Sequence, residues 1–265
     1  MQQHARAETV VRPMTTQISK LRRLNLVAAL LHTMSFLGIV LLSNDVTLPV
    51  TATYLTGPPT TDSFGAPITL LNLNVGFMIG AFLALSAFFH LLVISPKFWP
   101  RYTAGLEQRR NTFRWVEYSV SSSLMIIVIL QLNGVSDFVA LGGIFFVNVS
   151  MILFGWLQER YATPGDGDML PFWFGSLVGA VPWVAILMMA LSPKGPAGVA
   201  IPTFVWGIIV SLFVLFNCFA LVQFKQYRAT GRWSDYLHGE RRYVVLSIVA
   251  KSVLAWQVFG GTLAP

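Results

Sequence analysis

Seven long runs of apolar residues restrict what this sequence can fold into. Each run is long enough to cross a bilayer, which takes about 20 apolar residues in a helix. Hydrophobic residues make up 55% of the 265 residues and charged residues only 11%, which excludes an ordinary soluble domain. We therefore predict an all-α membrane protein, with a polar segment in residues 1–23 and one seven-helix bundle in residues 24–265. The expected spans are 24–43, 68–94, 112–132, 136–158, 170–191, 200–224 and 241–263.

The distribution of lysine and arginine predicts the orientation of the bundle. Sixteen basic residues fall in the N-terminal segment and the loops on its side, whereas the opposite side carries only Lys194. Because basic residues accumulate in cytoplasmic loops, we expect a multi-pass protein of the cell membrane with a cytoplasmic N-terminus and an extracellular C-terminus. This topology accounts for the net charge of +7, so we expect no nucleic-acid partner.

Two loops carry further signals. Residues 46–55 in the first outer loop are rich in β-branched residues, and Gly57, Pro58 and Pro59 follow them. This pattern fits either a short β-hairpin over the helix ends or an irregular linker. The sixth loop mixes basic and aromatic residues, which is typical of a belt that contacts membrane lipid, with a cytoplasmic partner as the alternative.

One lysine lies in the middle of the last apolar run. Lys251 is nine residues beyond Arg242, which places its Cα about 13 Å into the membrane. A charged ammonium at that depth costs at least a few kcal/mol. Deprotonation removes this cost, and so does conversion to a Schiff base whose charge is paired with a carboxylate.

Glu117 is the one carboxylate that the sequence places well inside an apolar run. Asp137 and Glu159 bracket the fourth run and are expected at the membrane interface. Lys251 and Glu117 are therefore expected to pair between the seventh and third helices. An isolated intramembrane pair indicates a functional site, and a purely structural ion pair is the alternative.

The depth of Glu117 imposes a condition on this pairing. Glu117 follows Arg114 by only three residues, so hydropathy alone places it near the inner surface. To reach Lys251, the third helix is expected to begin earlier, near Gly105, with Arg114 facing the cytoplasm or an inner cavity.

Several polar residues are spaced to lie near the pair. Ser121 is one turn after Glu117 and Ser247 is one turn before Lys251, so each shares a helix face with its charged neighbour. Ser86 on the second helix is a weaker candidate. These serines either hydrogen-bond the charged groups or pack the helices together.

Two histidines and several aromatic residues complete the candidate set. His32 and His90 lie in the cytoplasmic halves of the first two helices, where they are either packing residues or a shared proton-holding site. Aromatic residues could also wall a flat conjugated ligand, although most aromatic positions in a bundle are core or belt. The aromatic candidates are Tyr118, Trp173, Trp206 and Trp256.

The sequences around the two charged residues resemble one family of retinal proteins. SIVAKSVLAWQVF around Lys251 and RWVEYSVSSSLM around Glu117 are similar to heliorhodopsin, as is the cytoplasmic N-terminus, and the resemblance covers residues 20–263. It implies a seven-helix bundle, usually dimeric, with all-trans retinal on Lys251 as a Schiff base and Glu117 as its counterion. It also implies nearby serines and a cytoplasmic-side polar cavity; these residues are Ser86, Ser121, Ser247, His32 and His90.

The resemblance implies a photoreceptor. We expect light to switch the bundle between two packings and the signal to pass to a cytoplasmic partner that the sequence does not identify. A light-driven proton or ion transporter is the alternative. It is disfavoured because the sequence places no second carboxylate deep in any span. A membrane enzyme with a Schiff-base lysine is less favoured still, since no acid–base or metal-binding constellation is evident.

Overall fold

The computed structural model describes residues 14–60, 62–192 and 201–264. Seven helices within these ranges are long and apolar enough to cross a membrane, which confirms the predicted fold class. The last of them continues into a π-helical turn, η2 (Phe259–Leu263), and is preceded by a 3₁₀ turn, η1 (Gly231–Ser234). The seven helices are α1 (Met14–Leu42), α2 (Val75–Ile94), α4 (Thr112–Leu132), α5 (Phe138–Tyr161), α6 (Leu170–Leu191), α7 (Thr203–Arg228) and α8 (Tyr236–Val258).

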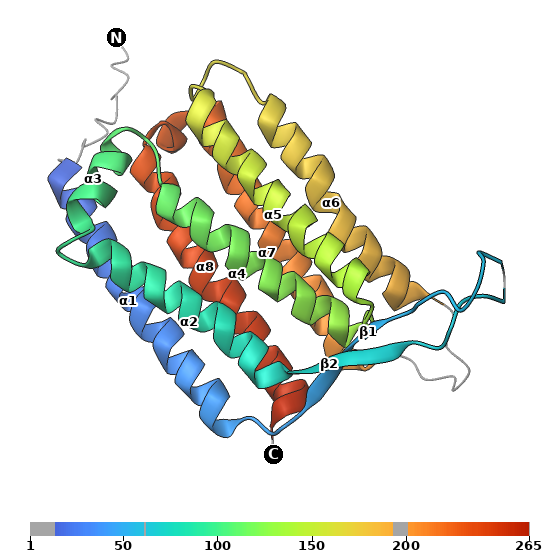
Figure 1. Ribbon diagram of the computed structural model, residues 1–265. Helices are drawn as coiled ribbons and strands as arrows, with labels where there is room; N and C mark the ends of the chain where they lie inside the picture. The colour runs from blue at the N-terminus through green and yellow to red at the C-terminus, as the bar shows by residue number, and fades with distance from the viewer. Residues whose placement is uncertain (1–13, 61, 193–200, 265) are drawn as a thin grey trace, which may run out of the picture.

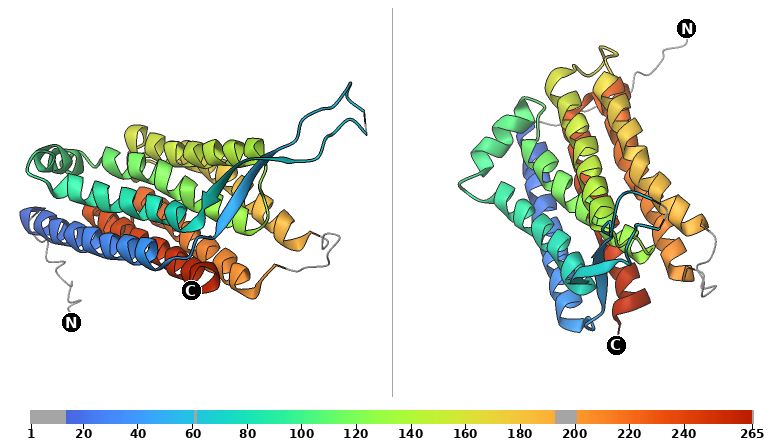
Figure 2. Two further views of the ribbon diagram at one scale, coloured as in Figure 1. Left: turned by 60° about the horizontal axis from the view of Figure 1, so that its bottom comes forward. Right: turned by 45° about the vertical axis from the view of Figure 1, so that its right-hand side comes forward.

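These helices form a closed ring around one apolar core (Figures 1 and 2). In order around the ring, α1 is followed by α2, α4, α5, α6, α7 and α8, and α8 packs back against α1. All seven helices contribute buried residues to the largest core cluster. The outer surface is also apolar: Met34, Leu177 and Met188 are 67%, 73% and 67% exposed. Exposed apolar surface on this scale is expected of a face that contacts lipid.

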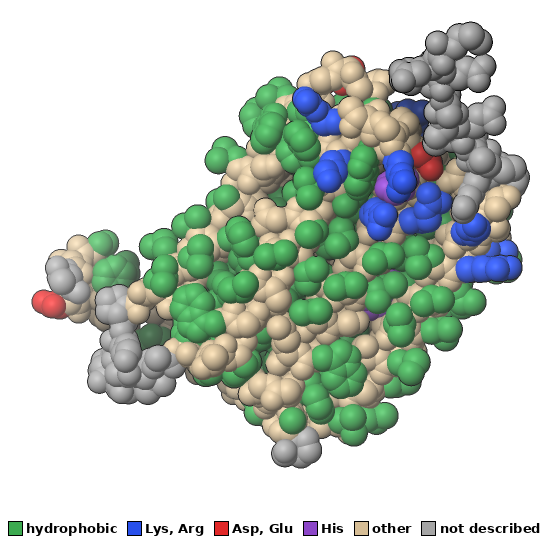
Figure 3. Space-filling view, turned by 180° about the vertical axis from the view of Figure 1, so that it is seen from behind, with side chains coloured by type: hydrophobic (Ala, Val, Ile, Leu, Met, Phe, Trp, Pro, Cys, Tyr) green, Lys and Arg blue, Asp and Glu red, His purple; other side chains and the backbone are tan. Residues whose placement is uncertain are grey.

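The two ends of the bundle differ in chemistry. One end, which we call the basic end, holds the start of α1, the short helix α3 (Trp99–Glu107) and the α7–α8 turn (Figure 1). Figure 3 shows lysine and arginine side chains gathered there and a largely apolar surface elsewhere on that face. The opposite end, which we call the hairpin end, carries a β-hairpin and the end of η2. In the described ranges, the exposed basic residues are Lys20, Arg22, Arg23, Lys97, Arg101, Arg109, Arg110, Arg160, Lys225, Arg228, Arg232 and Arg242.

The loop between the first two spans forms the hairpin rather than an irregular linker. Strand β1 (Thr47–Ala52) pairs antiparallel with β2 (Ile68–Asn74), with a bulge between Val50 and Thr51. The backbone N–H of Thr51 donates to the Ser136 carbonyl at 2.8 Å, which ties the hairpin to the start of α5. Residues 68–74 were expected in the second span and instead form β2. That span begins at Val75 because the Asn74 side chain accepts from Phe77 N at 2.9 Å and caps α2.

The expected early start of the third spanning helix is wrong, because the chain makes a separate helix there. α3 ends in a Schellman motif: Arg110 N donates to the Gly105 carbonyl at 2.8 Å and Arg109 N to the Leu106 carbonyl at 3.0 Å. Arg109 adopts a left-handed backbone (φ 56°), which cannot continue an α-helix. α4 then starts afresh at Thr112, where the Asn111 side chain caps it by accepting from Arg114 N at 3.1 Å.

Candidate functional site

The two charged residues singled out in the apolar runs are in direct contact inside the bundle. Lys251 Nζ on α8 lies 2.6 Å from Glu117 Oε1 on α4, and the two side chains are 4% and 5% exposed. Nζ also donates to Ser247 Oγ at 3.0 Å, one turn earlier on α8. Removing one partner from such a buried pair would leave an uncompensated charge, at a cost of about 3–5 kcal/mol.

Glu117 reaches Lys251 because α4 starts deeper in the bundle than α8. Asn111, just before α4, donates its side-chain N–H to Glu240 in the second turn of α8 at 2.7 Å. The start of α4 is therefore level with the second turn of α8. Helical side chains also lean toward the N-terminus of their own helix, so the long Lys251 side chain extends back toward the basic end. These two features replace the early start of the third helix that the sequence led us to expect.

A serine on a third helix also contacts the carboxylate. Ser86 Oγ on α2 donates to Glu117 Oε1 at 2.6 Å. One oxygen of Glu117, a residue of α4, therefore accepts hydrogen bonds from residues of both α8 and α2. Ser121, one turn further along α4, is fully buried, and its hydroxyl has no partner within the described residues.

The two histidines lie against each other. The His32 and His90 rings stack with their centroids 5.6 Å apart and their planes 14° apart. His90 Nδ1 is 2.7 Å from Asn25 Oδ1, so Asn25 on α1 joins a polar group in which the sequence had indicated only the histidines. His32 is fully buried, and neither of its ring nitrogens has a hydrogen-bond partner in the described part of the chain.

The aromatic candidates separate into two groups. The Tyr118 ring lies with its centroid 5.1 Å from Lys251 Nζ, and Trp206 is partly buried against the main core. Trp173 and Trp256, in contrast, are 57% and 43% exposed on the outside of the bundle. Trp256 is five residues beyond Lys251, which turns it about 140° around α8 from the lysine. The structure does not bring these two tryptophans to Lys251.

A second charged cluster lies nearer the basic end, and the sequence did not reveal it. The Arg114 guanidinium forms ion pairs with Glu159 of α5 and Glu240 of α8, one nitrogen to each carboxylate. The three residues are 7%, 5% and 0% exposed. Asn111 N donates to Glu159 Oε1 at 2.6 Å, and Tyr236 Oη donates to Glu159 Oε2 at 3.1 Å.

This cluster corrects two expectations. Glu159 is buried by protein rather than lying at the interface, and Glu117 is not the sole buried carboxylate. Hydropathy predicted an interfacial Glu159 because it considers only the position of a residue along an apolar run. It does not account for α3 and the loops, which bury groups close to a helix end. Arg114 was the available signal, since an arginine inside an apolar run requires carboxylate partners.

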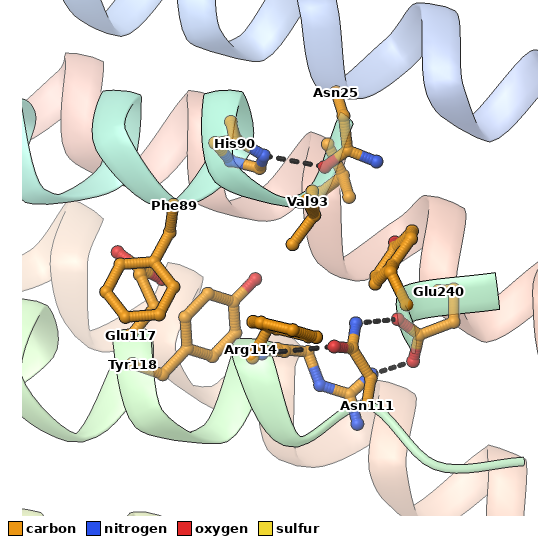
Figure 4. A pocket seen from close by; sticks show the side chains of 12 residues that line it. Asn25, Phe89, His90, Val93, Asn111, Arg114, Glu117, Tyr118 and Glu240 are labelled. Atoms are coloured by element: carbon orange, nitrogen blue, oxygen red, sulfur yellow. Dashed lines mark hydrogen bonds and ion pairs between the residues drawn. The ribbon is translucent and has the colours of Figure 1, made fainter. Parts of the chain in front are cut away.

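A small cavity joins the two charged sites (Figure 4). His90, Glu117 and Tyr118 line one part of it, and Arg114 and Glu240 line another. Its volume of about 40 Å³ is enough for two or three water molecules. It is far smaller than the several hundred Å³ of a typical organic-ligand pocket.

Comparison with solved structures identifies the fold. The crystal structure of cyanorhodopsin from the cyanobacterium Tolypothrix sp. NIES-4075 is similar, with a TM-score of 0.56 and 11% identity, covering 92% of this chain and 91% of that one. The transmembrane domain of Salpingoeca rosetta rhodopsin phosphodiesterase is similar with a TM-score of 0.60 and 8% identity, covering 93% and 88%. At these identities the likeness establishes a rhodopsin-type fold alone.

Sequence comparison identifies the family. No curated protein sequence matches this chain. The heliorhodopsin family model matches residues 21–263, which include every spanning helix except the first turns of α1. The chain therefore belongs to the heliorhodopsin family of retinal rhodopsins.

Proposed function

We propose that this protein is a light sensor that carries all-trans retinal as a Schiff base on Lys251. The observation that carries the proposal is the buried contact between Lys251 Nζ and Glu117 Oε1. A primary amine enclosed in the core is a group that condenses with an aldehyde, and the carboxylate beside it can balance the charge that a protonated Schiff base keeps on the same nitrogen.

The residues around Nζ fit such a group. Ser247 accepts from Nζ, Ser86 holds Glu117, and the Tyr118 ring lies beside Nζ. The buried Ser121 hydroxyl, which lacks a partner, adds a polar group one turn from Glu117. When bound, retinal would supply the absorption of visible light and a light-driven change of shape at Nζ.

The chain can pass a change at Nζ to three helices. Glu117 Oε1 accepts from Lys251 on α8 and from Ser86 on α2. If Nζ moves or loses its proton, the hydrogen bonds at this oxygen must rearrange. Because the oxygen belongs to α4, the rearrangement affects the packing of α2, α4 and α8 together. A local change in charge that biases helix packing is the usual basis of a molecular switch.

The position of the buried acids favours a sensor over a transporter. Within the described residues, the buried carboxylates are Glu117, Glu159 and Glu240, and the last two lie on the basic-end side of the first. None lies between Lys251 and the hairpin end. A pump requires proton-binding groups on both sides of the Schiff base, usually acids. The site therefore allows a proton to leave toward the basic end and return by the same route.

We extend the proposal to the membrane orientation, the oligomeric state and the partners of the protein. The collection of lysine and arginine at the basic end supports a cytoplasmic location for that end (Figure 3). The family resemblance adds a homodimer within the membrane lipid and a signalling partner at the cytoplasmic face.

Replacing Glu117 with glutamine is expected to abolish the visible absorption band near neutral pH. The protonated Schiff base would lose a partner worth about 3–5 kcal/mol, so in buffer without chloride it would release its proton and absorb in the near-ultraviolet. Added chloride could replace the carboxylate, and the visible band would then return. Absorption spectra of the purified, retinal-loaded variant test this, with the exposed Glu107→Gln as the matched control. A Glu117→Gln spectrum identical to wild type at every pH would show that the counterion lies elsewhere.

Illumination is expected to move no net charge across the membrane. The described residues provide no buried acid toward the hairpin end, so a released proton has no exit there. Voltage-clamp recording and pH measurement in suspensions of expressing cells test this. A steady photocurrent, or a sustained light-driven pH change that a protonophore abolishes, would refute the sensor and support a transporter.

A tag placed before Met1 is expected to be inaccessible from outside the cell. Within the described residues, the basic end carries twelve exposed lysines and arginines, and such residues are retained in the cytoplasm during insertion. Labelling with a membrane-impermeant reagent, before and after permeabilisation, measures this directly. A second tag after Pro265 should show the opposite pattern. Labelling of the first tag in intact cells would reverse the proposed orientation.

A further inference from the structure

The Arg114 cluster carries a buried charge that helix packing does not explain. One guanidinium faces two carboxylates, so Arg114, Glu159 and Glu240 together have a formal charge of −1 when both acids are ionised. The Lys251–Glu117 pair, in contrast, is balanced. A buried excess charge is costly, so a cluster that retains one is suited to bind a cation or a proton.

The hydrogen bonds indicate that both acids are ionised at rest. Glu159 Oε1 accepts from the backbone N–H of Asn111 at 2.6 Å. A backbone N–H can only donate, so this oxygen must be the acceptor. The Asn111 side chain is also fixed, because its Oδ1 accepts from Arg114 N and leaves Nδ2 to donate to Glu240 Oε2. The start of α4 adds the positive end of a helix dipole at the same place. Both carboxylates are therefore held as acceptors.

The cavity connects this cluster to the Lys251 site. Glu117 and Arg114 line the same cavity, and its volume of about 40 Å³ admits a short chain of water (Figure 4). Arg114 Nε is buried and has no hydrogen-bond partner within the described residues. An unsatisfied donor on a residue that lines a polar cavity is a site for such a water.

Apolar side chains pack beside the cluster toward the basic end. Tyr102 and Leu106 of α3 pack with Leu21 of α1 and with Tyr236 and Leu237 of α8 in a second apolar cluster. These residues are each between 0% and 7% exposed. The three charged residues of the cluster are themselves at most 7% exposed, which limits direct contact of a proton held there with the bulk solvent.

We propose that Arg114, Glu159 and Glu240 form a proton-holding site that stores the proton released from Lys251 Nζ. An N–H bond at Nζ breaks and leaves its electron pair on nitrogen; an O–H bond forms on Glu159 or Glu240, and the cluster charge changes from −1 to zero. The reverse transfer restores the resting state. This inference rests on the proposed function, because it requires the proton of a protonated Schiff base.

Other groups near the cluster are weaker stores. Tyr236 and Tyr243 of α8 and Tyr102 of α3 are neutral phenols, which would acquire a positive charge if they accepted a proton. Glu117 is the nearest acceptor, but it lies 2.6 Å from Nζ and would return the proton at once. His90 would become a half-buried cation stacked against His32. Only the cluster gains neutrality and holds the proton away from Nζ.

The test is infrared difference spectroscopy of the full-length, retinal-loaded protein with ¹³C-labelled glutamate carboxyls. When the near-ultraviolet species forms in the light, a glutamic acid C=O band should appear. Either Glu159→Gln or Glu240→Gln leaves the cluster neutral, so each should remove the band and speed decay of the near-ultraviolet species at least about tenfold. The exposed Glu107→Gln should leave both unchanged.

Each outcome is decisive. A band that persists in both glutamine variants would place the proton on Glu117 and overturn the inference. If a glutamine variant forms no pigment, Glu240→Asp and Glu159→Asp keep the charge but carry no label at that position. In at least one of them an unlabelled aspartic acid band should replace the labelled glutamic acid band; an unchanged labelled band in both overturns the inference. A near-ultraviolet species with no glutamic acid band would overturn the inference alone, whereas a wild-type protein without a visible band would overturn the proposed function as well.

Discussion

The cost of burying charge determines how this protein is built. Lys251 can occupy the middle of an apolar helix only because Glu117, which carries the opposite charge, lies 2.6 Å away. The carboxylate is in turn held by Ser86, so the pair joins α8, α4 and α2 at one oxygen atom. The apolar core, to which all seven helices contribute, encloses the pair apart from the small cavity that Glu117 lines. Any change at the lysine nitrogen therefore acts directly on helix packing.

A second constraint places all the buried acids on one side of the lysine. Glu159 and Glu240 lie toward the basic end, whereas the described part of the hairpin-end half contains no buried carboxylate. The water-sized cavity extends from Glu117 in the same direction. Among the described residues, the buried charged groups thus lie at the lysine or on its basic-end side, whereas buried polar residues toward the hairpin end, such as Gln131 and Asn133, are uncharged. This asymmetry supports reversible movement of a proton within one half and disfavours its passage across the membrane.

Periodicity and composition were sufficient to predict the seven-helix fold, because a chain in lipid must satisfy its backbone hydrogen bonds within long helices. The pairing of Lys251 with Glu117 was also predictable, because unpaired charges inside apolar runs are too costly to retain. Helix boundaries were harder. Residues 68–74 were assigned to a helix, because an apolar strand that directly precedes a spanning helix cannot be distinguished from it by hydropathy. Only the Asn74 cap marks where β2 ends and α2 begins.

Burial near the helix ends could not be derived from the sequence. Glu159 and Glu240 lie close to the ends of apolar runs, where hydropathy predicts an interface, and their burial depends on how α3 covers the basic end. The span expected over 112–132 matches α4, but the added condition that this helix begin near Gly105 was wrong. The sequence carried no signal of the break, because Arg109, rather than the glycine that usually marks such a turn, occupies the left-handed position at the end of α3. The exposed position of Trp173 and Trp256 likewise depends on helix rotation, which composition does not specify.

The central claim is that Lys251 carries the chromophore, and peptide mapping tests it most directly. The wild-type protein would be loaded with all-trans retinal, reduced with borohydride, digested and analysed by mass spectrometry. The account predicts a retinyl group on the peptide that contains Lys251 and none on the peptides that contain the exposed Lys20, Lys97 and Lys225. An unmodified Lys251 in a protein that shows a visible band, with the label on another lysine, would contradict it.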